Sequence, residues 1–118
     1  MLIKSIIGIL RIIRIDSCVL GAGMIFLPYM LATGNVKMAL VFSLPVFFGS
    51  AAGFILNDIS DAEKDRVNHP GRPIPSGVIS VLHAKILFFM AFFLAAASLV
   101  SMEGSFGLML SNAIFLIM

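Results

Sequence analysis

The run from Met38 to Leu56, MALVFSLPVFFGSAAGFIL, decides the fold because it holds 19 residues without a single charge. At about 1.5 Å of rise per residue, a helix of this length just crosses a hydrocarbon layer about 30 Å thick. Across the whole chain, 60% of the 118 residues are hydrophobic and only 12% are charged. A soluble domain is nearer half apolar and a quarter charged. The composition therefore excludes an ordinary soluble domain and indicates a membrane protein.

Apolar segments on both sides of this run predict an all-α, multi-pass transmembrane bundle. Before it, Lys4, Gly8 and Arg11 share one face of an amphipathic segment whose other face is rich in Ile, which is typical of a helix lying in the membrane interface. We expect an interfacial helix over residues 1–11, full spans over 12–32, 38–56 and 83–102, and a partial fourth span over 104–118. Because this last segment is too short to cross the bilayer, we expect the chain to be the N-terminal part of a larger transmembrane domain.

The basic residues predict the orientation of the bundle. Of the eight Lys and Arg residues, only Lys37 falls on one side of this topology. The other seven fall on the opposite side: Lys4, Arg11, Arg14, Lys64, Arg66, Arg72 and Lys85. Since basic residues are enriched on the cytoplasmic side, we expect a cell-membrane protein whose N-terminus and 57–77 loop are cytoplasmic. Basic residues that flank apolar spans are anchors, so we expect no nucleic-acid partner.

The loop 57–77, NDISDAEKDRVNHPGRPIPSG, holds seven of the fourteen charged residues. If the preceding helix continues into the loop at about 100° per residue, the first Asn of the loop and its three Asp side chains share one quarter of the helix surface. These four residues are Asn57, Asp58, Asp61 and Asp65. Oxygen ligands suit Mg²⁺, which is usually held by one or two carboxylates together with substrate phosphates. The alternative interpretation is a solvated charge run that ends a transmembrane helix.

Basic and amide side chains follow this cluster, at Arg66, Asn68 and Arg72. An Arg guanidinium can bind two phosphate oxygens at once. A cation-binding helix face beside such residues, opening onto lipid, suits a ligand with an anionic head and an apolar tail. A prenyl diphosphate fits this description.

The spacing N-D-x-x-D-x-x-x-D over 57–65, followed by R-P-I-P-S-G over 72–77, resembles the first signature of the UbiA superfamily of intramembrane prenyltransferases. The resemblance implies a nine-helix bundle in which two Asp-rich motifs bind Mg²⁺ and the diphosphate of an isoprenyl donor. It implies catalytic roles for Asp58, Asp61 and Asp65, which together with Asn57 would hold the metal. It also implies that the donor diphosphate contacts Asn57, Arg66, Asn68 and Arg72. The implied reaction is ionisation of the donor to an allylic cation, which the acceptor attacks.

The short connection Arg66–Gly71 resembles the branches of the superfamily that make archaeal lipids and chlorophyll, and the first is favoured. We therefore expect transfer of a long isoprenyl group, geranylgeranyl in this interpretation, to a lipid or glycerol-phosphate acceptor among the membrane lipids. Prenylation of an aromatic or tetrapyrrole acceptor is the alternative.

Two features depart from the superfamily pattern. The Arg-Pro-x-Asn run common near its first span is replaced by Arg14-Ile15-Asp16-Ser17, and a second Asp-rich motif is absent. An Asp inside a span is a functional candidate by default, although Asp16 could also pair with Arg11 or Arg14. We expect the 118 residues alone to be inactive, and a non-enzymatic membrane fragment is a further alternative. A CDP-alcohol phosphatidyltransferase is disfavoured because Asp58 is followed by Ile59 instead of Gly.

Overall fold

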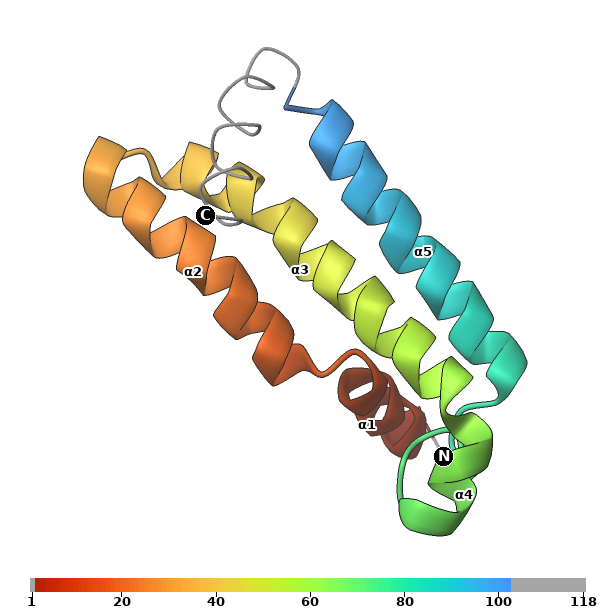
Figure 1. Cartoon of the computed structure of the whole chain (residues 1–118). Coiled ribbons are helices and arrows are strands. Elements are labelled where there is room, and N and C mark those ends of the chain that lie inside the picture. The colour runs from red at the N-terminus through yellow and green to blue at the C-terminus, as the bar shows by residue number, and fades with distance from the viewer. Residues whose placement is uncertain (1, 103–118) are drawn as a thin grey trace.

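The computed structural model describes residues 2–102, and within that range every regular element is a helix (Figure 1). The elements are α1 (Leu2–Ile12), α2 (Ile15–Thr33), α3 (Val36–Ser60), α4 (Ala62–Asn68) and α5 (Val81–Val100). The predicted all-α class is confirmed. The partial span expected over 104–118 lies outside the described residues.

Three of these helices, α2, α3 and α5, are long and apolar enough to cross a membrane. They contain 19, 25 and 20 residues with mean hydropathies of 1.6, 2.0 and 1.9. Large apolar side chains remain exposed along them, as Leu20 does on α2 and Phe93 on α5. Such surfaces are costly in water and stable against lipid tails. The prediction of a multi-span membrane protein is confirmed.

The helix α3 lies between α2 and α5 and packs against both (Figure 1). Its buried positions include the small residues Ala51 and Ala52, followed by the fully buried Ile55. On α5 the buried residues are again small, at Ala84, Ala91 and Ala95. Small side chains at helix contacts let the backbones approach closely, which is how helices pack in membranes.

The helix α3 continues past the predicted span 38–56 and ends at Ser60. Asn57 and Asp58 are therefore helical. Between Gly53 and Pro70 the chain has no Gly or Pro that would end the helix earlier. The helix breaks at Asp61, whose φ of −93° and ψ of 2° are not helical, and α4 begins at the next residue. The start of the polar segment is thus two helices joined at Asp61.

The joint between α1 and α2 turns sharply at Arg14, which has a left-handed φ of 49°. As a result α1 lies at the end of the bundle near α4 (Figure 1). There Gly8 is buried against the segment that precedes α5, and a Cβ added to it would meet Val78 Cγ1 at 2.6 Å. Only glycine permits this approach, so Gly8 fixes how closely α1 packs on the loop after α4.

Candidate active site at the charged end of the bundle

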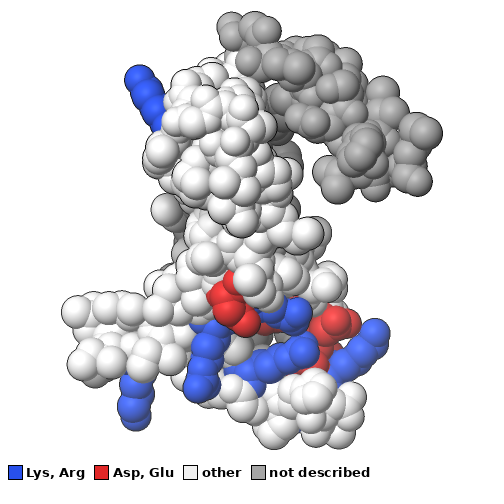
Figure 2. Space-filling view, turned by 90° about the vertical axis from the view of Figure 1, so that its left-hand side faces the viewer, with Lys and Arg blue, Asp and Glu red and all other residues white. Residues whose placement is uncertain are grey.

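Charged side chains gather at one end of the molecule (Figure 2). Four segments meet there: the α1–α2 joint, the end of α3, the short helix α4 and the loop 69–80 that leads into α5. Because the long helices are almost uncharged, the chemistry available to the described chain is concentrated at this end.

Asp58, two residues before the end of α3, is the centre of the cluster. Its side chain is 7% exposed, and its Oδ1 lies 3.4 Å from Arg14 Nη2 and 3.8 Å from Arg72 Nη1. The guanidinium of Arg14 also lies over the ring of Phe54, 4.9 Å from its centre. A buried carboxylate needs cationic or hydrogen-bonding partners. Here they come from the α1–α2 joint and from the loop after α4.

Asp65, on α4, is equally buried and accepts a hydrogen bond from Arg72 Nη1 at Oδ2. It follows Asp58 by seven residues, so two turns of almost continuous helix place both carboxylates on the same side. Arg72 is positioned by the turn after α4, in which its N–H donates to His69 O at 3.1 Å and its carbonyl accepts from Ser76 N at 3.0 Å. One guanidinium therefore joins two buried carboxylates from consecutive helices.

The other predicted site residues lie on the exposed side of α3 and α4. Asp61 pairs with Lys64 at 3.6 Å, and its side chain is 45% exposed. Arg66 pairs with Glu63 at 3.7 Å, and both Asn57 and Asn68 are exposed. Within residues 2–102 the His, Cys, Asp and Glu side chains form no group of three that could hold a metal ion. The structure thus brings Asp58, Asp65 and Arg72 together and leaves Asp61 and Arg66 outside this cluster.

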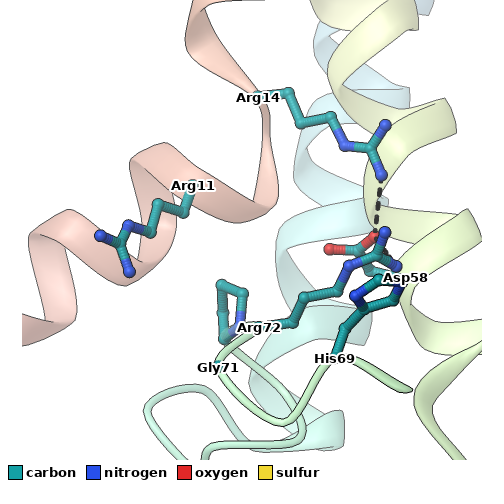
Figure 3. A pocket seen from close by; sticks show the side chains of 7 residues that line it. Arg11, Arg14, Asp58, His69, Gly71 and Arg72 are labelled. Atoms are coloured by element: carbon teal, nitrogen blue, oxygen red, sulfur yellow. Dashed lines mark hydrogen bonds and ion pairs between the residues drawn. The ribbon is translucent and has the colours of Figure 1, made fainter. Parts of the chain in front are cut away.

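A pocket of about 470 Å³ opens beside Asp58 (Figure 3). It is lined by Arg11, Arg14, Asp58, His69, Gly71, Arg72 and Pro73. Arg14 and Arg72 both reach toward Asp58, whereas Arg11 lies on the other side of the pocket and points away from Asp58 (Figure 3). With three guanidinium groups and one carboxylate in its lining, the pocket suits an anionic ligand.

Sequence reasoning missed the two arginines near the start of the chain. The sequence predicts an anchor or a partner of Asp16 at Arg14, whereas the structure pairs Arg14 with Asp58, 44 residues away. Asp16 is exposed and makes no ion pair within the described part of the chain. The only signal in the sequence is the pair of basic residues at the start of the predicted first span, and these do not reveal a long-range partner.

Comparison with known proteins adds to this geometry. Residues 18–118 match the UbiA prenyltransferase family. The chain belongs to this family. The resemblance drawn from the Asp and Arg spacing is therefore confirmed over most of the sequence.

Curated relatives of this UbiA-family chain include several digeranylgeranylglyceryl phosphate synthases. The protein of that name from Saccharolobus solfataricus is 39% identical over 97 residues, which are 82% of this chain and 34% of the relative. The one from Methanoregula boonei is 34% identical over 113 residues, which are 94% of this chain and 40% of the relative. The chain thus spans little more than a third of the length of the relatives it matches.

A solved structure shows the same arrangement of helices. It comes from work giving structural and mechanistic insights into the biosynthesis of digeranylgeranylglyceryl phosphate synthase in membranes, and it is 31% identical with a TM-score of 0.72. The match covers 80% of this chain and 35% of the solved chain. The helices described here therefore follow the UbiA-family fold.

The carboxylate oxygens at this end are suitable ligands for a hard divalent cation. Asp58 and Asp65 offer carboxylate oxygens close enough to share Arg72 Nη1. Mg²⁺ is commonly held by one or two carboxylates, with the remaining positions taken by water and substrate phosphates. Two acidic side chains beside an anion-binding pocket meet that requirement.

Proposed function

We propose that the whole protein is a membrane prenyltransferase that moves a geranylgeranyl group from its diphosphate to a glyceryl phosphate that already carries one such group. The names of the relatives support this substrate pair, because a product with two geranylgeranyl groups needs one transfer to an acceptor with one. As this chain spans about a third of those relatives, the activity is proposed for the complete bundle, to which these residues contribute one end.

The observation that carries the proposal is the pairing of Arg14 and Arg72 with buried Asp58 beside a pocket at the end of apolar helices. A prenyl diphosphate has an anionic head for such a pocket and an apolar tail for the helices. Guanidinium groups bind phosphate oxygens in pairs and keep their charge at any physiological pH. Arg14 and Arg72 would therefore bind the diphosphate of the donor.

We further propose that Asp58 and Asp65 hold Mg²⁺, with Asn57 and Asp61 as the outer members of the same set. When bound, the cation neutralises charge on the diphosphate leaving group. Arg72 and Arg14 stabilise that charge as the bond between the prenyl carbon and the diphosphate oxygen breaks. The acceptor hydroxyl then forms the new carbon–oxygen bond and loses its proton. Arg66 and Asn68 would contact the outer oxygens of the diphosphate.

Prenyl transfer by the full-length natural protein in detergent tests this function. Labelled geranylgeranyl diphosphate would be offered with geranylgeranylglyceryl phosphate, 4-hydroxybenzoate or chlorophyllide as acceptor. We expect product only with the glyceryl phosphate, loss of product with EDTA and its return with Mg²⁺. Asp65→Asn should lower kcat/KM by about 100-fold, and the exposed neighbour substitution Glu63→Gln should change it less than twofold. Transfer to either of the other acceptors, or to none, would contradict the proposal.

We propose a cytoplasmic location for the N-terminus and the charged end. Seven of the eight basic residues lie at that end, and Lys37 lies in the first turn of α3 at the other. Labelling of intact cells with a membrane-impermeant maleimide tests the orientation in a Cys18→Ala background. Lys37→Cys should react from outside, and Arg66→Cys should react only after the cells are lysed. The reverse pattern would show the opposite orientation.

A further inference from the structure

We propose that the groove between α1 and the loop after α4 binds the phosphate group of the acceptor, with Lys4 and Arg11 as its cationic contacts. This inference rests on the proposed function, because it names the part of that site that recognises the second substrate. The groove has a volume of about 150 Å³, and Lys4, Gly8, Arg11, Gly71, Ser76 and Val78 are among its lining residues.

The two cations lie on the same face of α1. Lys4 and Arg11 are seven residues apart, so about two helical turns bring them into line with Gly8 between them. Gly8 is the point at which α1 touches Val78 and Ile79. The close approach at Gly8 therefore places both cations, which are exposed, along the edge of the loop.

Neither Lys4 nor Arg11 forms an ion pair within the described part of the chain. The ion pairs there engage Arg14, Arg72, Lys64 and Arg66, and residues 2–102 contain no acidic partner for Lys4 or Arg11. The groove has no Asp or Glu in its lining. A phosphate monoester carries a charge of about −1.5 to −2 at neutral pH. It would supply the negative charge that this groove lacks.

The groove adjoins the donor pocket. Arg11, Gly71 and Pro73 line both spaces, and Figure 3 shows Arg11 across the pocket from Arg14, Asp58 and Arg72. A donor diphosphate at Arg14 and Arg72 leaves Arg11 and Lys4 for a second anionic group. A geranylgeranylglyceryl phosphate has its one free hydroxyl on the same three-carbon unit as its phosphate, so a phosphate in the groove keeps that hydroxyl beside the donor pocket.

The position of α1 also suits a lipid-borne ligand. Leu2, Ile3 and Ile6 are 75%, 71% and 49% exposed, so α1 presents an apolar face beside its cations. An amphipathic helix of this kind lies at the membrane surface. A prenylated glyceryl phosphate could therefore reach the groove from the bilayer with its chain still in lipid.

Equilibrium binding to the full-length protein in nanodiscs of neutral lipid tests this assignment. The probes are geranylgeranylglyceryl phosphate, geranylgeranylglycerol without the phosphate, and soluble glycerol phosphate. Arg11→Gln and Lys4→Gln should each weaken binding of the first probe about tenfold and leave the second unchanged. Lys85→Gln, an exposed cation on α5, is the matched control and should bind all probes as the wild type does. Weakened binding of soluble glycerol phosphate in the same two variants would show that the groove binds the phosphate group itself, without help from the prenyl chain.

Three results would overturn the assignment. Equal affinity of the wild type for the first two probes would mean that the phosphate is not recognised. An equal loss for both probes would indicate a structural role for α1. An effect that is absent in these neutral nanodiscs and appears only when the measurement is repeated in anionic ones, or an equal effect in Lys85→Gln, would make bulk lipid head groups the occupant. Binding of geranylgeranyl diphosphate is measured in parallel, so that failure of donor binding, which concerns the proposed function, is seen separately.

Discussion

Arg72 is the residue on which the charged end depends, because it is shared by two carboxylates that are otherwise removed from solvent. Asp58 and Asp65 each have side chains only 7% exposed, whereas that of Arg72 is 34% exposed. Loss of one partner of a buried charge costs more than loss of an exposed pair, since the remaining charge stays desolvated. The same arrangement keeps close together the two carboxylates that we propose bind Mg²⁺.

Arg72→Gln should therefore lower the free energy of unfolding by about 2 kcal/mol. Arg66→Gln is the matched control, because Arg66 pairs with exposed Glu63 at 3.7 Å, and exposed pairs contribute less than about 1 kcal/mol. Thermal unfolding of the detergent-solubilised protein measures both. Adding Asp65→Asn to Arg72→Gln should restore part of the loss, since an amide needs no counter-charge. If Arg72→Gln unfolds at the wild-type temperature, the shared guanidinium does not stabilise this end.

At the residue scale, spacing predicted part of the cluster. The seven-residue interval between Asp58 and Asp65 put them on one face in advance, and the structure buries both. Asp61 had been placed on the same face by assuming a continuous helix, but the helix breaks at Asp61 itself and its side chain turns to Lys64. The contact of Arg14 with Asp58 joins segments 44 residues apart, and no local pattern encodes such a pair.

At the element scale, hydropathy predicted the three long helices, because a helix that spans a lipid bilayer is recognised by its length and apolar composition alone. It did not predict how they meet. The apolar pattern of α1 indicated an amphipathic helix, but not that Gly8 packs against Val78 and Ile79 or that Ile12 is fully buried. A Cβ added at Gly49 or Gly53 would meet nothing within 4 Å among the described residues, so neither glycine marks a close helix contact there. The buried small residues on α3 are Ala39, Ser43, Ala51 and Ala52.

Gly8→Ala tests the docking of α1. In a free helix the change from Gly to Ala is stabilising by about 1 kcal/mol. Here the new methyl group would lie 2.6 Å from Val78 Cγ1, so we expect destabilisation and faster amide hydrogen exchange over Leu2–Ile12. The double variant Gly8→Ala, Val78→Ala removes the clash and should exchange as slowly as the wild type. Slower exchange in Gly8→Ala alone would show that α1 does not pack against Val78.

At the scale of the whole molecule, the described helices carry exposed apolar surface along their length and charge at one end (Figure 2). The chain spans about a third of its relatives, and α5 still exposes large apolar residues such as Phe89, Phe92 and Phe93. Charge is concentrated at one end (Figure 2), where buried Asp58 and Asp65 meet Arg14 and Arg72. We propose that this end of the bundle binds the diphosphate of a prenyl donor together with Mg²⁺.

The most direct test is the affinity of the full-length protein for geranylgeranyl diphosphate, measured with and without Mg²⁺. The comparison includes the double variant Asp58→Asn, Asp65→Asn and the control Glu63→Gln, which alters an exposed acid on the same short helix α4. We predict binding that requires Mg²⁺, falls at least about 100-fold in the double variant and is unchanged in the control. Wild-type affinity in the double variant, or binding indifferent to Mg²⁺, would show that Asp58 and Asp65 do not bind the donor diphosphate through Mg²⁺.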